Sequence, residues 1–278
     1  MNILITGITG FFGKNFVTFL LKNKIDCTII GTAHSELKLA HFKKIFPSIQ
    51  IYIIDLASDQ FNHIIESVIQ THKINYIIHA AAMKHVDICQ NNPSMCLYVN
   101  AVATNILVNA AKKNNVTNLI ALSTDKTNNP SNVYGASKYI MQEIVLANNY
   151  SVYQGVNFFW SDGSVLDIWF NQFIKKNPIT IRNPNHTRYF NTIEHVCEVI
   201  FKNINSKRKI ILPDYVYTIK LKDLLDAFVE YFDYHQINFI DHYNYEKDVE
   251  KITEDMNKIE LKKTDIVKLI DDFHKNII

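Results

Sequence analysis

Two pairs of polar side chains carry the chemistry that this sequence is expected to perform. Tyr134 and Lys138 lie four residues apart in a segment with helical spacing, so both project from one helical face. An ammonium beside a phenol favours the phenolate, so we expect Lys138 to lower the pKa of Tyr134 and make it a base for a substrate hydroxyl. Asp125 and Lys126 follow Thr124 at the end of a predicted strand, where they offer an acid and a base. An exposed ion pair is the alternative interpretation of Asp125 and Lys126.

A glycine-rich turn follows the first predicted strand, in the segment GITGFFG. Glycine lets the backbone approach a pyrophosphate closely, and a helix that starts there aims its N–H groups and positive dipole end at the phosphates. The position of the turn, directly after a first strand, predicts a dinucleotide site. The cofactor-binding candidates in this turn are Gly7, Thr9, Gly10, Phe11, Phe12 and Gly13.

The ends of the second and third predicted strands bear on the cofactor. The second strand ends in GTAH and offers no carboxylate for a ribose 2′-hydroxyl, which favours NADP over NAD. His34 and Lys38 are candidate neighbours of a 2′-phosphate, with a solvated helix start as the alternative. Asp55 is a candidate acceptor for the adenine amino group, or a simple strand cap. The other cofactor-binding candidates are Leu56, Ala80, Ala81, Ala82, Lys84, Tyr134 and Lys138.

These side chains require a parallel sheet to position them. The β-branched runs NILIT, CTIIG, IYIID, NYIIH and NLIALS each precede a segment with helical spacing. This alternation predicts an α/β fold, a Rossmann-like doubly wound parallel sheet. We predict a dinucleotide-binding domain over residues 1–150 and a smaller substrate-binding lobe over 151–278, with segments that return to the sheet. The expected helices of the first domain run approximately over 11–23, 36–46, 60–72, 93–114 and 132–149.

Composition limits the classes of protein and partner. The 278 residues are 47% hydrophobic, enough to bury the core of a large α/β domain. Lys and Arg total 29 against 27 acidic residues, with no run of like charges, so we expect no nucleic-acid partner. The N-terminus lacks a basic lead and a cleavage site, and no stretch approaches about 18 apolar residues, so we expect a cytoplasmic protein without membrane contact. The four cysteines form no CxxC pair, which predicts reduced thiols and no metal site.

Longer motifs carry a family resemblance. AAMKHVD, STDKTNNPSNVYGASK and TIRNPNHTRYFNT resemble the inverting, 5-epimerising UDP-N-acetylglucosamine 4,6-dehydratases. These are extended short-chain dehydrogenases of bacterial and giant-virus polysaccharide biosynthesis. Retaining dehydratases carry an Asp-Glu pair where this chain has Asp125-Lys126. The resemblance implies an NADP-dependent lyase that yields UDP-2-acetamido-2,6-dideoxy-L-arabino-hexos-4-ulose for deoxysugar synthesis. It also implies a homodimer or higher homo-oligomer, in the host cytoplasm if the chain is viral.

The resemblance further implies roles for individual residues. Tyr134 would remove the O4 proton as C4 is oxidised, Lys126 would remove the C5 proton, and Asp125 would protonate the departing 6-hydroxyl. Which of Asp125 and Lys126 returns the C5 proton stays open. Arg182 and Arg188 would bind the uridine diphosphate, because guanidinium donors engage phosphate oxygens in pairs.

The remaining substrate-binding candidates come from the same resemblance. Solvated loop residues are the alternative for the two arginines, a surface lysine for Lys84, and a structural role for His85 and Asn100. The complete substrate-binding set is Lys84, His85, Asn157, Ser164, Thr180, Arg182 and Arg188.

The chain departs from the family pattern at two places. His34 stands where relatives carry an arginine, which keeps NAD open as the cofactor. Gln154, Trp160 and Asp162 replace an arginine, a glycine and a second arginine of the relatives, which predicts a rebuilt substrate wall.

Two other functions compete with the dehydratase. An NADPH-dependent sugar-nucleotide 4-ketoreductase or epimerase needs the glycine turn, Tyr134 and Lys138, but has no need of Asp125 and Lys126. A non-catalytic dinucleotide-binding protein would result if the altered pocket has lost its substrate.

Overall fold

The computed structural model describes residues 1–240, 252 and 256–277, and the chain divides into two compact units. Unit 1 comprises Met1–Gly155 and Ile193–Leu212, and unit 2 comprises Val156–Thr192 and Pro213–Ile278. The sequence predicted a division after residue 150. In the structure the five residues of β6 (Ser151–Gly155) still pair in the large sheet, and Ile193–Leu212 returns to unit 1.

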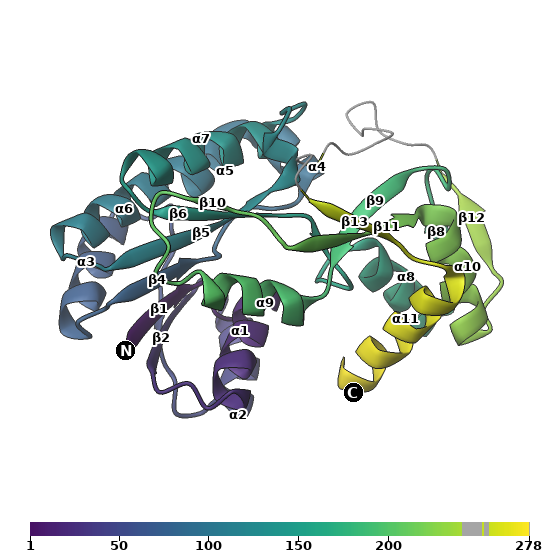
Figure 1. The fold of residues 1–278 in the computed structure, drawn as a ribbon, viewed down its shortest axis with the longest axis horizontal. Helices are drawn as coiled ribbons and strands as arrows, with labels where there is room; N and C mark the ends of the chain where they lie inside the picture. The colour runs from purple at the N-terminus through teal and green to yellow at the C-terminus, as the bar shows by residue number, and fades with distance from the viewer. Residues whose placement is uncertain (241–251, 253–255, 278) are drawn as a thin grey trace. The chain divides into compact units, whose positions relative to one another are not determined.

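Unit 1 is built on a seven-stranded sheet in the order β10-β6-β5-β4-β1-β2-β3, in which every pairing is parallel (Figure 1). The strand order reverses at β1, which pairs with β2 on one side and with β4 on the other. The predicted Rossmann-like α/β fold is confirmed, and such sheets bind ligands beyond the carboxyl ends of the strands at the reversal. The strands besides β6 are β1 (Asn2–Thr6), β2 (Thr28–Ala33), β3 (Gln50–Ile53), β4 (Tyr76–His79), β5 (Asn118–Thr124) and β10 (Ile210–Ile211).

Helices cover both faces of this sheet. Helices α1 and α9 pack together on one face, while α3, α6 and α7 adjoin one another on the other (Figure 1). Leu4, Ile77 and Leu119 of the central strands are fully buried between these layers, as expected for strands whose sequences are apolar throughout. The helices of unit 1 are α1 (Phe11–Lys22), α2 (Glu36–Ile45), α3 (Phe61–Thr71), α4 (Val86–Asn91), α5 (Pro93–Leu97), α6 (Ala103–Lys113), α7 (Val133–Ala147) and α9 (Ile193–Lys202).

The predicted helix over 93–114 differs from the observed one. Its ends are right, but a π-helical segment, Tyr98–Val102, interrupts it between α5 and α6. The stretch Pro93–Lys113, in which an 18-residue window has a mean hydropathy of 1.3, is the single helical stretch among the described residues that is long and apolar enough to cross a membrane. Half of that window is buried inside the structure, where Leu107 and Val108 join the core, so a core helix accounts for its composition.

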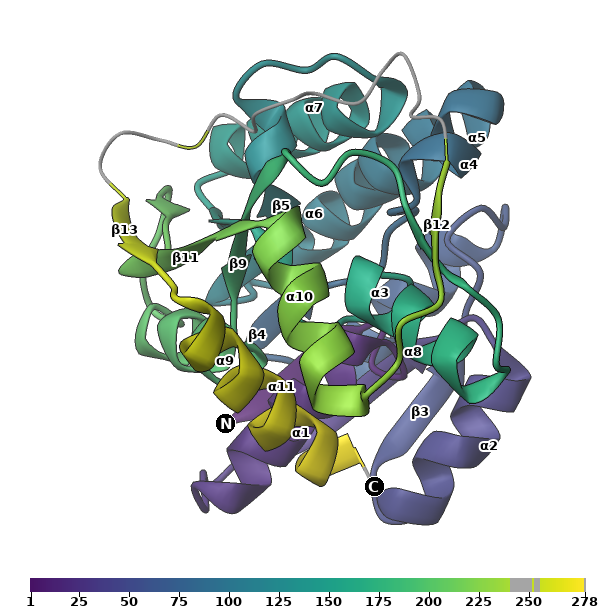
Figure 2. The ribbon, with the colours of Figure 1, turned by 90° about the vertical axis from the view of Figure 1, so that its right-hand side faces the viewer.

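Unit 2 has a small four-stranded sheet, β13-β11-β9-β7, and a two-stranded sheet, β12-β8. Helices α10 and α11 lie side by side (Figure 2). The core of the unit combines aliphatic and aromatic side chains, and Trp160 stacks on Phe273 with ring centroids 5.5 Å apart. The elements are β7 (Asn157–Phe158), α8 (Val165–Ile174), β8 (Ile179–Ile181), β9 (Thr187–Asn191), β11 (Tyr215–Lys220), α10 (Leu221–Phe232), β12 (Ile237–Phe239), β13 (Asn257–Glu260) and α11 (Lys263–Ile277).

Candidate active site

The glycine turn lies between β1 and α1 and is closed by the segment after β4. Gly7 adopts φ +68°, and a Cβ atom there would come within 3.0 Å of the Ala81 backbone. A Cβ at Gly13 would lie 2.5 Å from the carbonyl oxygen of Ile8, so α1 packs directly on the turn. Gly10 is the N-cap of α1, where a Cβ would meet only the carbonyl oxygen of Gly7 within 4 Å. The turn therefore leaves a side-chain-free helix N-terminus of the kind that holds phosphates.

The ends of β2 and β3 bring two cofactor candidates together. Nε2 of His34 lies 3.7 Å from Oδ2 of Asp55, and both side chains are largely exposed. Asp55 also caps its own turn, because its Oδ1 accepts a hydrogen bond from the N–H of Ala57 at 2.9 Å. Ser35 caps α2 by accepting from the N–H of Lys38. His34 and Lys38 thus lie at the start of α2, where the dipole favours an anion.

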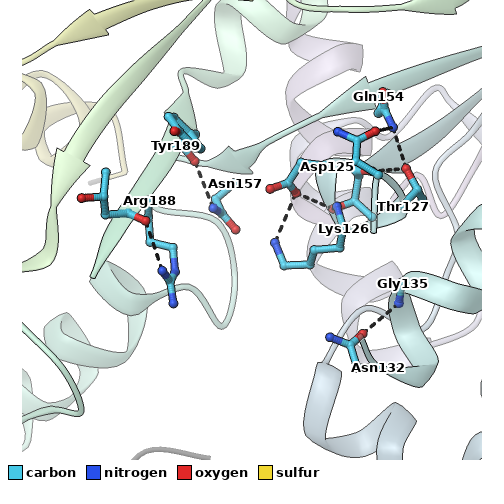
Figure 3. Close-up of polar contacts among 12 residues, drawn as sticks. Asp125, Lys126, Thr127, Asn132, Gly135, Gln154, Asn157, Arg188 and Tyr189 are labelled. Carbon is cyan, nitrogen blue, oxygen red and sulfur yellow. Dashed lines mark hydrogen bonds and ion pairs between the residues drawn. The ribbon is translucent and has the colours of Figure 1, made fainter. Parts of the chain in front are cut away.

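The acid and base candidates lie on one short turn. Strand β5 ends at Thr124, and a 3-10 turn, Asp125–Thr127, follows. Oδ1 of Asp125 accepts a hydrogen bond from the Thr124 hydroxyl at 2.8 Å and forms an ion pair with Nζ of Lys126 at 3.3 Å (Figure 3). The carboxylate side chain is only 1% exposed, against 26% for Lys126. The alternative of an exposed ion pair is therefore wrong.

Tyr134 and Lys138 lie in the first two turns of α7, and the N-cap Asn132 accepts a hydrogen bond from the N–H of Gly135 at 2.9 Å. The prediction that Lys138 lowers the pKa of Tyr134 is wrong. Burial raises the pKa of Tyr134 to about 12, and the charge that opposes this rise is that of Lys126. The amine of Lys138 donates to the Leu122 carbonyl, and burial lowers the pKa of Lys138 to about 8.

A buried polar chain connects the glycine turn to α6. Oγ1 of Thr6 accepts from the N–H groups of Ala80 and Ala81, and it lies 2.7 Å from Nδ1 of His79. Nε2 of His79 lies 2.9 Å from Oγ1 of Thr104. Burial, followed by the charge of Lys138, lowers the pKa of His79 to about 3, so this imidazole is neutral at physiological pH. Sequence reasoning missed His79, because an isolated histidine at a strand end has no distinguishing pattern.

Asn100, in the π-helical segment, links the loop after β4 to the catalytic helix. Its side chain accepts from the N–H of Met83 at 2.8 Å and donates to the Met83 carbonyl at 3.0 Å. It also donates to Oγ of Ser137 at 2.9 Å, and Ser137 donates to the carbonyl of Tyr134 at 2.8 Å. The structural alternative for Asn100 agrees with these bonds, but they tie together the segments that carry Lys84 and Tyr134. Lys84 itself is exposed, as is His85, the N-cap of α4.

Unit 2 carries the other substrate candidates. Arg188 lies on β9, and its Nη1 donates to the Thr187 carbonyl at 3.1 Å (Figure 3). Its Nη2 lies 2.9 Å from Nδ1 of His186. Asn157 donates to the carbonyl of Tyr189 at 3.0 Å.

The other three substrate candidates also lie in unit 2. Arg182 is exposed directly after β8. Ser164 caps α8, and the Thr180 hydroxyl accepts from Gln172 at 2.8 Å, so both contribute to local structure. Their roles toward a substrate stay predictions.

With this geometry in place, comparison with known proteins decides the family. The model of a family described as polysaccharide biosynthesis protein matches residues 3–270. The chain belongs to this polysaccharide biosynthesis family. The resemblance predicted from the motifs is confirmed by an inverting UDP-N-acetylglucosamine 4,6-dehydratase of Campylobacter jejuni, which is 32% identical over 81% of this chain and 70% of its own length.

A second sequence relative and a solved structure are also similar to this chain. A Methanocaldococcus jannaschii protein named only as an uncharacterized membrane protein is 30% identical over 82% of this chain and 70% of its own length. A Streptomyces venezuelae dTDP-glucose 4,6-dehydratase, solved with NAD bound, shares the fold with a TM-score of 0.85 over 99% of this chain and 98% of its own. Its sequence identity is 15%, so it supports the fold alone.

Proposed function

We propose that this member of the polysaccharide biosynthesis family is a UDP-N-acetylglucosamine 4,6-dehydratase that inverts C5. The observation that carries the proposal is the Asp125–Lys126 pair, a buried carboxylate 3.3 Å from an amine. Both charges act on the pKa of Tyr134, so the three groups share one electrostatic environment. A 4-ketoreductase or epimerase needs no such acid and base beside the tyrosine, whereas elimination across C5 and C6 needs both.

The residues present fit a nicotinamide dinucleotide. The side-chain-free turn of Gly7, Gly10 and Gly13 would hold the pyrophosphate, and the start of α2 with His34 and Lys38 would hold a 2′-phosphate. We therefore propose NADP, with NAD as the alternative because His34 is paired with Asp55. When bound, the nicotinamide supplies the uptake and return of a hydride.

The protein's own residues would then handle the protons. Tyr134 would accept the proton of the 4-hydroxyl, assisted by the Thr124 hydrogen bond and the Lys126 charge, both of which lower its pKa against the effect of burial. The 4-ketone acidifies the C5 hydrogen. Transfer of a proton from the Lys126 ammonium to its ion-pair partner Asp125 would give the neutral amine that takes the C5 proton. Asp125 would give a proton to the departing 6-hydroxyl. Proton return to the other face of C5 gives UDP-2-acetamido-2,6-dideoxy-L-arabino-hexos-4-ulose.

Unit 2 would supply the nucleotide contacts. Arg188 is half-buried, and its guanidinium is held by the Thr187 carbonyl and His186, which pre-orders the group for a diphosphate. Arg182 would add a second guanidinium. The candidates Lys84, His85 and Asn157 would contact the sugar.

We also propose a homodimer. Large apolar side chains are exposed on helices of unit 1 that pack beside one another, and a second copy would cover them. These are Ile88 of α4, Met95 and Leu97 of α5, Val102 of the π-helical segment, and Tyr139 and Ile140 of α7. The cytoplasmic location stays a prediction.

The decisive experiment is proton NMR of the protein with UDP-N-acetylglucosamine in deuterated water. A dehydratase with inversion gives a new C6 methyl signal and a deuterated, inverted C5, and it turns over with only catalytic cofactor. Net oxidation of added NADPH on a 4-keto sugar nucleotide would instead establish a reductase. Thermal stabilisation by NADP without any response to UDP-sugars would establish a non-catalytic dinucleotide-binding protein.

A further inference from the structure

Gln154 on β6 holds the turn that carries the acid and base (Figure 3). Its Nε2 donates to Oγ1 of Thr127 at 2.6 Å and to Oδ1 of Asn128 at 2.8 Å. The residue is 4% exposed, and β6 places it opposite Ser123 in the parallel register with β5. A buried amide that donates to two side chains of one turn restrains that turn, because losing both acceptors would leave its own N–H groups buried and unpaired.

The two acceptors are themselves bonded to the start of the turn. The Thr127 hydroxyl donates to the carbonyl of Thr124 at 2.7 Å, and the N–H of Asn128 donates to the carbonyl of Asp125 at 3.1 Å. Gln154 therefore holds the far end of a turn whose near end carries the Asp125 carboxylate. The whole arrangement lies within unit 1.

Helix α7 also packs against the turn Asp125–Thr127. A Cβ atom at Gly135 would lie 2.7 Å from the carbonyl oxygen of Lys126, so only a glycine lets the helix approach this closely. The same helix carries Tyr134 and Lys138. The turn is thus held between β6 and the catalytic helix, and neither hydrogen bond of Gln154 reaches Tyr134 or Lys138.

We infer that Gln154 is a positioning residue that sets Asp125 and Lys126 for the elimination step and acts less on oxidation at C4. This inference rests on the proposed function. Lys126 and Thr124 contribute to the oxidation at C4 only through the pKa of Tyr134.

The test replaces Gln154 by methionine, which keeps the length and removes both donors. Gln142→Met is the matched control, since Gln142 is 5% exposed on α7 and, among the described residues, makes no hydrogen bond to the turn. Two steps are followed with UDP-N-acetylglucosamine in deuterated water: formation of reduced nicotinamide by absorbance, and formation of the C6 methyl and C5 deuterium by NMR. In Gln154→Met, methyl formation falls about 10- to 100-fold, as expected for misplaced catalytic groups. Formation of reduced nicotinamide falls less than methyl formation, so reduced nicotinamide accumulates, and Gln142→Met behaves as wild type.

A second variant tests the same inference if Gln154→Met folds poorly. Thr127→Val has nearly the same shape and removes the acceptor that links Gln154 to Thr124, so it should reproduce the same split between the two steps. The double variant should be no worse than either single variant, because both remove one connection. A parallel loss of both steps, or Gln154→Met indistinguishable from Gln142→Met, would overturn the inference while leaving the proposed function standing. Absence of methyl product from the wild-type protein would overturn both.

Discussion

The two units of the chain differ in where they place ionisable side chains. Unit 1 buries Asp125, Lys138 and His79, each of which is at most 5% exposed. In unit 2 the ion pair between Lys263 of α11 and Glu230 of α10 is largely exposed. Buried ionisable groups cost stability unless they are hydrogen-bonded, and they are concentrated where a protein does chemistry. Exposed ion pairs contribute little.

The hydrophobic cores of the two units also differ in composition. Unit 1 has an aliphatic core of Ile, Leu, Val and Ala, with the hydrogen-bonded polar chain from Thr6 to Thr104 inside it. Unit 2 has a core that combines aliphatic side chains with packed rings and has few buried charges. We therefore expect variants in unit 1 to change reaction rates more than folding, and variants in unit 2 to change substrate affinity and stability.

The largest effect is expected for Lys126→Ala. It removes the proposed C5 base, so methyl formation should fall about 100- to 10,000-fold, while the melting temperature and cofactor affinity stay near those of the wild type. Lys263→Ala, which breaks the exposed ion pair with Glu230, is the matched lysine control and should keep full turnover. Full turnover by Lys126→Ala would remove this lysine from the mechanism. Equal losses of turnover in Lys126→Ala and Lys263→Ala would show that a lysine in unit 1 matters no more for catalysis than one in unit 2.

Arg188→Ala tests unit 2 as the nucleotide-binding part. Losing charge-assisted hydrogen bonds to a diphosphate should raise KM for UDP-N-acetylglucosamine about 10- to 100-fold with a smaller change in kcat. Arg208→Ala removes the same charge from an exposed position in unit 1 and should leave KM unchanged. Steady-state kinetics give both constants. The alternative of a solvated loop residue is wrong for Arg188, which is half-buried on β9, so an unchanged KM in Arg188→Ala would leave this arginine only its contacts with Thr187 and His186.

The parts of the molecule that sequence could predict are those set by local pattern. The period of the apolar residues predicted five strands and the ends of five helical stretches of unit 1 to within two residues, but not α4 or α9, and spacing placed Asp125, Lys126, Tyr134 and Lys138 correctly at the end of β5 and the start of α7. These features depend on residues that lie close together in the chain.

The parts that sequence missed depend on contacts between distant segments. The π-helical segment at Asn100 pairs with Met83, 17 residues earlier, and Gln154 holds Thr127, 27 residues earlier. The pKa of Tyr134 was predicted in the wrong direction because four-residue spacing shows a neighbouring ammonium but not the burial that outweighs it. Contacts between residues so far apart in the chain leave no periodic signal in the sequence.

The pH dependence of kcat/KM tests the effect of burial on Lys138. Burial lowers the pKa of Lys138 to about 8, so its amine is protonated below that pH and neutral above it. If the ammonium is the active form, kcat/KM should fall about tenfold for each pH unit above 8. Lys138→Arg stays charged in this range, so its residual activity should lack the falling limb. A falling limb that survives in Lys138→Arg would assign it to another group.

The smallest effect concerns the backbone of Trp160 in unit 2. This residue adopts φ +56°, a left-handed conformation that favours glycine, yet its ring is 3% exposed and packs on Phe170, Phe232 and Phe273. Trp160→Ala should lower the free energy of unfolding by about 3–5 kcal/mol, because the ring contacts are lost and the strain remains.

Trp160→Gly loses the same ring contacts but relieves the strained φ, so it should be about 1 kcal/mol more stable than Trp160→Ala. Denaturant unfolding of the two variants measures this difference, and cofactor affinity in unit 1 should be equal in both. The usual order, with glycine less stable than alanine, would show that the left-handed backbone stores no strain. The expected order would mean that aromatic packing in unit 2 stabilises the fold enough to hold a tryptophan where the backbone alone would favour glycine.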